Sequence, residues 1–485
     1  AKDRFRLNLQ FMDDMSEFPF APSVAYLSRE REDETSRTLL DVGYDRSDPN
    51  SVVNSLHVNA YVHMTEIEEV QKLECFASSC ASAPLSTFVR KIRDQVDTFN
   101  YDTYGLEARG TTSVGSLGQG AFFTYGLELY RDEVEQLRTR NETTFATAVA
   151  PGVPQPTAVT ASVPDATSDT YALYLQGEVV LSDKVSIIPG IRWDFWDLEA
   201  TVNTAGFNNG AGLLTDQNKD QDDDKVNPKI GFVVELMDNL NLTGNFSQGF
   251  RAPAFQELFL SSPHRPGREF IPNPNLKPEE SENYDIGLKG GGEKVHFSVN
   301  YFYNQVDDFI AFRIVNFQGN PTCAPSFFPP FPSNCQEAAV NIQAATIEGV
   351  EASFDYAITP ALLFYGNYTR TRGTDDLNNV PLTDISPEKA LAGFLLEHEC
   401  NLSWCQQFYI DLRGRFIGRP DRLGPGETVT GGYSVYDIRA GVDMSDSLRA
   451  SAAVENLSDK EYQEFLSGGL TAEGINVAVN LRYRF

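Results

Sequence analysis

Residues 475–485 read INVAVNLRYRF, and their pattern is the strongest indication of the fold class. Their apolar side chains alternate with polar ones, which include Arg482 and Arg484. Successive side chains of a β-strand point to opposite faces, so one face here is apolar and the other is charged. We therefore predict a strand with one hydrocarbon face and one wet face.

The same alternation recurs in residues 295–304, 408–416 and 448–455. In the second of these, Asp411 and Arg413 alternate with Ile410 and Leu412. A soluble fold places its charge outside and its hydrocarbon inside. Repeated strands whose polar face is this highly charged are instead typical of a transmembrane β-barrel with a water-filled interior.

Composition agrees with a barrel. The 485 residues are 41% hydrophobic and 12% aromatic, and no run approaches the roughly twenty apolar residues of a transmembrane helix. A membrane protein without such a run must be a closed barrel, because lipid offers the backbone no partners. With 39 basic and 68 acidic residues the net charge is −29, which argues against nucleic acid as a partner. We predict an all-β, antiparallel transmembrane barrel surrounded by lipid of the bacterial outer membrane.

The connections between strands alternate in length. Short turns such as 182–184, 237–239 and 445–447 alternate with long loops such as 11–35 and 66–100. Bacterial barrels place their short turns in the periplasm and their long loops outside. Counting back from the last strand gives 18 strands, the first at residues 5–10. No domain linker, helical repeat or signal peptide is visible, so residues 1–485 are expected to form one barrel domain.

Six cysteines fall into three close pairs, and each pair lies within one connection. The pairs are Cys75 and Cys80, Cys323 and Cys335, and Cys400 and Cys405. Even number and local spacing predict three small disulfide loops made in an oxidising compartment. Metal binding is the alternative, but no pair has CxxC spacing and a nearby histidine, His398, accompanies only Cys400.

Residues 245–287, NFSQGFRAPAFQELFLSSPHRPGREFIPNPNLKPEESENYDIG, resemble the TonB-dependent outer-membrane receptors, and more narrowly their haem and haemoglobin branch. Two boxes carry the resemblance, FRAP and NPNL. They comprise Phe250, Arg251, Ala252, Pro253, Asn273, Pro274, Asn275 and Leu276. Further matches lie at residues 101–107, 124–133, 348–351 and 455–462, so the resemblance covers nearly the whole chain. Siderophore receptors carry similar boxes.

The boxes also have a purely physical interpretation. Pro253, Pro272, Pro274 and Pro278 fix φ and remove backbone donors, which ends strand pairing and stiffens the root of the loop. A stiff root holds the intervening loop over the mouth of the barrel. Loop anchoring is therefore the alternative to ligand binding for most of these residues.

His264 lies between the boxes, seven residues after Glu257, where the resemblance implies a histidine that binds haem iron. Neutral imidazole is a good ligand for haem iron. Of the five histidines, His264 alone is expected in an extracellular loop, and a solvated loop histidine is the alternative. The second axial ligand of the family comes from a plug domain that this chain does not show. Tyr61 or Tyr101 could serve instead.

Two other loops suggest binding. Asp216, Asn218, Asp220 and Asp222 are spaced like calcium ligands, although the glycine turn and distal glutamate of a calcium loop are missing. A solvated acidic tip is the alternative. The loop between Cys323 and Cys335 sets Phe327, Phe328 and Phe331 among prolines. This stiff apolar tip is a candidate docking surface for a protein, and packing against neighbouring loops is the alternative.

No GxSxG, HExxH or phosphate-binding glycine loop is present, so we expect no enzyme. The resemblance implies a receptor, energised by TonB, that imports an iron-containing ligand. The expected ligand is haem, free or taken from a haem-carrying protein or surface lipoprotein, and no cofactor is expected to stay bound. A receptor for a ferric siderophore or another metal chelate is the first alternative. A passive 18-stranded porin is the second, and the two boxes argue against it.

Receptors of the resembling family carry an N-terminal plug and 22 strands. The present chain therefore looks like the last 18 strands of such a barrel. The plug and the first strands are expected to be absent from it.

Overall fold

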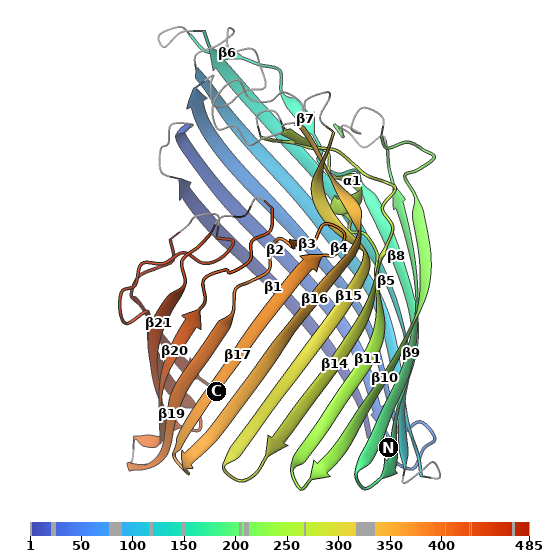
Figure 1. The fold of residues 1–485 in the computed structure, drawn as a ribbon. Coiled ribbons are helices and arrows are strands. Elements are labelled where there is room, and N and C mark those ends of the chain that lie inside the picture. The colour runs from blue at the N-terminus through green and yellow to red at the C-terminus, as the bar shows by residue number, and fades with distance from the viewer. Residues whose placement is uncertain are drawn as a thin grey trace.

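The computed structural model describes residues 2–484 except 21–25, 77–89, 116–119, 147–150, 203–205, 208–212, 266–267, 317–334, 403, 426, 428 and 468–470. These residues form one curved sheet with a single short helix at its outer end, α1 (Phe255–Phe259) (Figure 1). In the described part of the chain, no helix is long and apolar enough to cross a membrane.

Eighteen described strands have eight residues or more, and each is antiparallel to the next, as the turn spacing predicts. They are β1 (Lys2–Phe20), β2 (Tyr26–Ser47), β3 (Ser55–Phe76), β4 (Arg90–Val114), β5 (Ala121–Phe145), β8 (Ala166–Ser182), β9 (Val185–Ala200), β10 (Gln221–Met237), β11 (Leu240–Arg251), β14 (Glu279–Gly291), β15 (Val295–Asn316), β16 (Cys335–Thr359), β17 (Leu362–Asp375), β19 (Lys389–Leu402), β20 (Cys405–Ile417), β21 (Tyr433–Ser445), β22 (Leu448–Glu455) and β23 (Asn476–Tyr483). Five shorter strands lie in the outer loops: β6 (Val153–Pro154), β7 (Ala158–Thr160), β12 (Ser262–Arg265), β13 (Arg268–Phe270) and β18 (Val380–Pro381).

The predicted alternation of faces is present in the structure. On β8, Leu173 and Leu175 are 52% and 46% exposed, as expected of side chains that face lipid, whereas Thr170 and Ala172 on the opposite face are buried. Exposed aromatic side chains mark the outer end of this apolar band, among them Tyr104, Tyr171, Trp193, Tyr284 and Tyr301. Such a girdle is typical of outer-membrane barrels. Beyond it, the outward side chains become charged, as at Arg131 on β5 and Asp169 on β8.

Several strands run farther outward than predicted. The first strand was expected at residues 5–10 but spans Lys2–Phe20, and β3 and β4 take up most of the predicted loop 66–100. Figure 1 shows β2 to β5 reaching well beyond the outer ends of β17 to β21. Outside the membrane both faces of a hairpin are in water. The side chains of the two faces therefore no longer differ in polarity, although the backbones stay paired. The predicted strand ends were therefore wrong.

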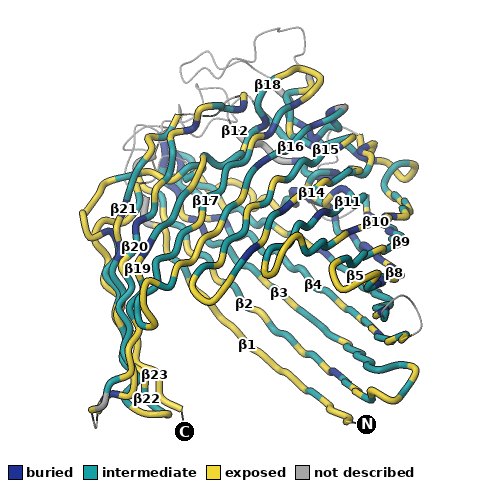
Figure 2. Tube along the Cα trace, turned by 60° about the horizontal axis from the view of Figure 1, so that its bottom comes forward, coloured by how far each residue is buried: buried dark blue, intermediate teal, exposed yellow. Residues whose placement is uncertain are grey.

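The sheet has two open edges in the described part of the chain. β1 pairs with β2, β23 pairs with β22, and no described residues pair β1 with β23. Figure 2 shows these edge strands apart, with mostly exposed residues along them. A self-closed 18-stranded porin requires the first and last strands to pair. The described strands do not form that closure.

The cysteine predictions have mixed outcomes. Cys400 and Cys405 form a disulfide at the turn between β19 and β20, with their Cα atoms 5.6 Å apart, which confirms one predicted pair. Cys75 is disulfide-bonded, and its predicted partner Cys80 lies outside the described residues. Cys323 and the side chain of Cys335 also lie outside them.

Candidate functional site

One arginine joins the two sides of the loop between β11 and β14. Arg251 ends β11 and donates Nη1 and Nη2 to the carboxylate of Glu257, at 2.9 and 3.1 Å. The same guanidinium donates Nε and Nη2 to Glu279 at the start of β14, at 2.7 and 2.6 Å. Paired hydrogen bonds of this kind fix geometry as well as charge. Arg251 of the FRAP box therefore ties the root of the loop together.

The helix α1 fills the space behind this clamp. Glu257 accepts a hydrogen bond from the Ala254 backbone N–H at 2.7 Å, which satisfies a donor at the start of the helix. The side chains of Leu258 and Phe259 have no exposed surface. They pack into an apolar cluster with Trp196, Leu198, Leu214, Leu276, Ile310 and Ala339. A small hydrophobic core thus lies at the outer end of the sheet.

The NPNL box is held by strand β16. Asn273 donates its side-chain amide to the Ala339 carbonyl at 2.8 Å. Asn341 accepts from the Lys277 N–H at 2.9 Å and donates to the Lys277 carbonyl at 2.8 Å. The box therefore makes anchoring contacts, as its physical interpretation predicts. We call α1 with the two boxes, residues 250–259 and 273–279, the rim unit.

His264 lies in β12, which pairs with β13. The register shifts between Pro263 and Arg265, so His264 sits at a bulge, an irregularity that is common beside functional sites. β13 in turn pairs in parallel with the start of β16, where Arg268 is opposite Cys335. The His264 side chain lies outside the described residues, and its role as an iron ligand stays a prediction.

A cavity of about 970 Å³ lies against the wall beneath the rim unit. All four FRAP residues line it, and so does Tyr101, one of the two tyrosines considered as ligands. Tyr61, the other, packs its ring against Gly105. The remaining lining combines aromatic, charged and amide side chains, including Phe99, Tyr130, Tyr174, Trp196, Phe255, Glu128, Asp132, Asp194, Arg192, Lys229, Gln176, Asn227 and Gln248.

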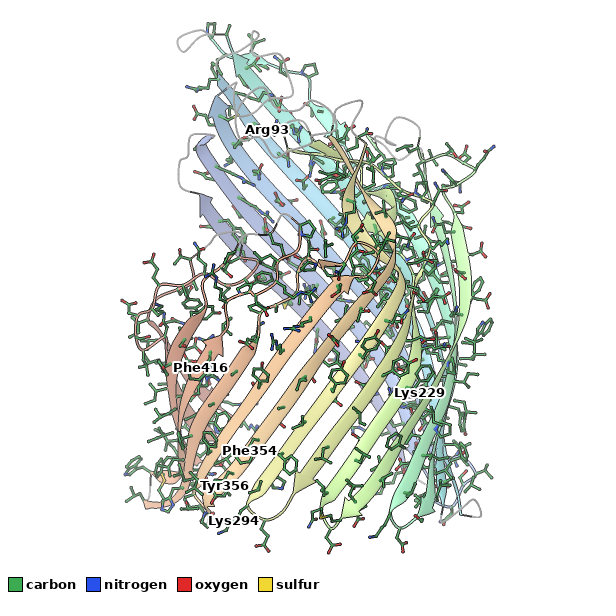
Figure 3. The ribbon with its side chains drawn as sticks, viewed as in Figure 1. Arg93, Lys229, Lys294, Phe354, Tyr356 and Phe416 are labelled. Atoms are coloured by element: carbon green, nitrogen blue, oxygen red, sulfur yellow. A yellow bond between two sulfur atoms is a disulfide. The ribbon has the colours of Figure 1, made fainter. Side chains whose placement is uncertain are left out.

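Most charges in this wall are paired. Arg192 donates to Glu128 at 2.8 Å and to Asp194 at 2.7 Å, and its guanidinium lies 5.9 Å from the ring centre of Tyr174. Lys229 differs, because it donates to the Gln176 amide and has no ion pair among the described residues. Figure 3 shows Lys229 in the wall below α1. The cavity therefore contains one ammonium that no described carboxylate neutralises.

Asn227 supplies a second uncommitted group. It is 9% exposed and donates to Asp194 at 3.1 Å, while its Oδ1 has no partner among the described residues. Nothing in the sequence alone distinguishes Asn227, Lys229 or Arg192 as site residues. Their polar character at alternate positions of β9 and β10 was the available signal, but only the strand register brings them together.

The acidic loop gains no geometric support as a calcium site. Asn218 Oδ1 accepts from the Thr215 N–H at 2.7 Å, and Asp220 pairs with Lys219 at 2.7 Å. Over the described ranges, no three His, Cys, Asp or Glu residues are grouped so that they could hold a metal. Calcium binding by Asp216, Asn218, Asp220 and Asp222 stays a prediction. Phe327, Phe328 and Phe331 lie outside the described residues.

The family is established by comparison with known proteins. Residues 3–457 match the model of the TonB dependent receptor-like, beta-barrel family. Among curated relatives, the heme/hemopexin utilization protein C of Haemophilus influenzae strain Rd is 26% identical over 82% of this chain and 53% of its own length. The hemin receptor of Yersinia pestis is 28% identical over 75% of this chain and 48% of its own. The chain thus spans about half the length of these relatives.

Solved structures agree on the fold. The structure of the copper transporter OprC matches this chain with a TM-score of 0.68 and 15% sequence identity. The match covers 98% of this chain and 72% of the OprC chain. The family model matches residues 3–457, which is most of the sequence, and the OprC structure shares the overall fold of this chain. This chain belongs to the TonB-dependent receptor family of outer-membrane β-barrels.

Proposed function

We propose that the protein takes part in the import of haem across the outer membrane. The observation that carries the proposal is the rim unit, in which Arg251 joins the FRAP and NPNL sides of the loop beside a cavity of about 970 Å³. Binding cavities for small molecules commonly measure about 300–1,000 Å³, a range that accommodates a tetrapyrrole. Relatives named for haem or hemin supply the substrate class.

The fold alone does not select haem, because the copper transporter OprC has the same barrel. The wall chemistry favours a flat ligand with an acidic edge. Tyr101 and Tyr130 offer aromatic faces, and Lys229 offers a cation for a carboxylate. In this proposal, His264 binds the iron from above, and the ligand then moves into the cavity.

The remaining partners belong to the same proposal. Energy reaches the receptor through TonB, and haem arrives free or from a haem-carrying protein or surface lipoprotein. Haem is cargo rather than a resident cofactor.

Replacing His264 by alanine tests the iron ligand. We expect haem affinity to fall at least about tenfold, equivalent to about 1.4 kcal/mol, because an axial ligand is lost. Titration of the purified protein in detergent, followed by the Soret band, measures the change. His296→Ala, at the short-turn end of β15, is the matched control and should bind haem like the parent.

The two possible failures differ in this titration. Equal affinity of the parent and His264→Ala would remove the ligand assignment and leave the receptor function standing. Absence of any Soret change in the parent, together with binding of a ferric siderophore, would overturn haem as the substrate.

A further inference from the structure

A cluster of cations covers the inner face of the tall hairpins β2 to β5, beyond the aromatic girdle. Its members are Arg31, Lys91, Arg93, Arg138 and Arg140, interspersed with Asp33, Glu69, Asp97 and Glu142. The chain as a whole carries a net charge of −29, so an excess of cations on one face is unusual here. Figure 3 places Arg93 within this raised part of the sheet. We call this set the upper cluster.

Strand register places these residues on one face. Arg31 is opposite Gln71, Gln71 is opposite Gln95, and Gln95 is opposite Arg140, which makes one row across four strands. The next row toward the membrane runs from Asp33 through Glu69 and Asp97 to Arg138. Continuing down β4 by two residues at a time leads to Phe99 and Tyr101 in the cavity wall. The upper cluster and the cavity therefore share one continuous surface.

Four of the five cations already have carboxylate partners. Arg31 pairs with Glu69 at 3.1 Å, Lys91 and Arg93 pair with Glu142 at 2.8 and 2.7 Å, and Arg138 pairs with Asp97. Arg140 is the exception. Its Nε and Nη2 donate to Gln95 Oε1 at 3.0 and 2.9 Å, and it has no ion pair among the described residues.

The surroundings of Arg140 disfavour its charge. Burial lowers the pKa of the Arg140 guanidinium from its ordinary value, and the positive charges of Arg93 and Arg138 lower it further, against a smaller opposing effect of Glu142 and Asp97. An incoming carboxylate would relieve this crowding and meet a planar group suited to bind it with two hydrogen bonds.

We infer that the upper cluster, centred on Arg140, is a first-contact site for the carboxylates of the imported ligand. It lies nine residues beyond Arg131 on β5, or roughly 30 Å along the strand at about 3.3 Å per residue, and therefore projects into the medium. An anion held there can descend along the inner face of β4 to the cavity. The inference rests on the proposed function and adds that the ligand is captured through its acidic groups.

Stopped-flow binding of iron(III) protoporphyrin IX to the detergent-solubilised protein tests the inference. We expect Arg140→Gln to slow association about threefold to tenfold at low salt, because local cations raise the encounter rate of an anion. The difference should vanish near 1 M salt, where charges are screened beyond about 3 Å. The charge-matched control is Arg370→Gln, which removes an exposed arginine paired with Asp421 at the outer end of β17.

The dimethyl ester of the same porphyrin completes the experiment, because it lacks both carboxylates. Its association with the parent and with Arg140→Gln should be equal, which also shows that the variant is folded. Equal rates of parent and variant with the free acid would overturn the inference while haem binding itself stands. Slowing of acid and ester alike would also overturn it, since the role of Arg140 would then be structural. No binding by the parent would instead remove the proposed function, and the inference with it.

Discussion

Replacing Phe259 by alanine should release the rim unit from the barrel wall. Phe259 has no exposed surface and packs with Leu198, Leu276 and other members of the outer apolar cluster. Truncating a buried phenylalanine costs about 3–5 kcal/mol, through lost burial and the cavity that remains. That loss falls on the core behind α1, whereas the hydrogen bonds of Arg251, Asn273 and Asn341 hold the two ends of the loop, so we expect local opening of residues 252–278 while the barrel stays folded.

Limited proteolysis and a haem titration together measure this effect. Cleavage between β11 and β14 should become fast, and haem affinity should fall by at least about tenfold, or 1.4 kcal/mol. Phe354→Ala is the matched control, since Phe354 is 40% exposed on the outward face and lies far from α1 (Figure 3). A Phe259→Ala protein with parental protease resistance and affinity would show that the rim unit does not depend on this core.

Asp437→Ala should give the second large effect, at the other side of the sheet. The Asp437 side chain is fully buried and accepts from Arg413 Nε at 3.2 Å, Arg415 Nε at 3.1 Å and the Asn456 N–H at 3.0 Å. Removing the carboxylate leaves two guanidinium groups without their shared partner. The two arginine side chains are 20% and 33% exposed and their guanidinium groups can be solvated, so we take the cost of a lost hydrogen bond to a charged group, about 1.5–3 kcal/mol.

We expect the free energy of unfolding in urea to fall by that amount, and the loop after β22 to loosen because Asn456 loses its contact. Asp437→Asn keeps an acceptor and should cost less. Asp443→Ala breaks an ion pair with Arg449, whose side chain is 57% exposed, and should cost less than about 1 kcal/mol. Equal stability of Asp437→Ala and Asp443→Ala would contradict the structural role of the buried carboxylate.

The sequence predicted the barrel because alternation leaves a direct trace in the amino acids. Leu173 and Leu175 face outward as the period of a strand requires, and the number of long strands follows from the turns. The ends of β3 and β4 could not be predicted in the same way. Once both faces are wet, residues such as Glu68 and Glu69 give no contrast between inside and outside, although their backbones remain paired.

The candidate site was predictable only in part. The prolines of the two boxes predicted an anchored loop, and the contacts of Asn273 and Asn341 are of that kind. The partners of Arg251, Lys229 and Arg140 depend on which residues of neighbouring strands stand opposite each other. A period of two identifies the face on which a side chain lies but not its neighbour on the next strand. Only the strand register therefore shows that Lys229 and Arg140 lack an ion pair among the described residues.

The parallel pairing of β13 with β16 has a consequence for exchanging loops between receptors. Three residue pairs join the hairpin that carries His264 to the strand that follows residues 317–334, and Gln336 donates to Glu269 at 2.7 Å across this seam. A graft of residues 252–278 alone would meet a foreign β16 and lose these pairings. To transfer ligand preference from one receptor to another, residues 252–278 and 317–334 should therefore be exchanged together, along with the first residues of β16.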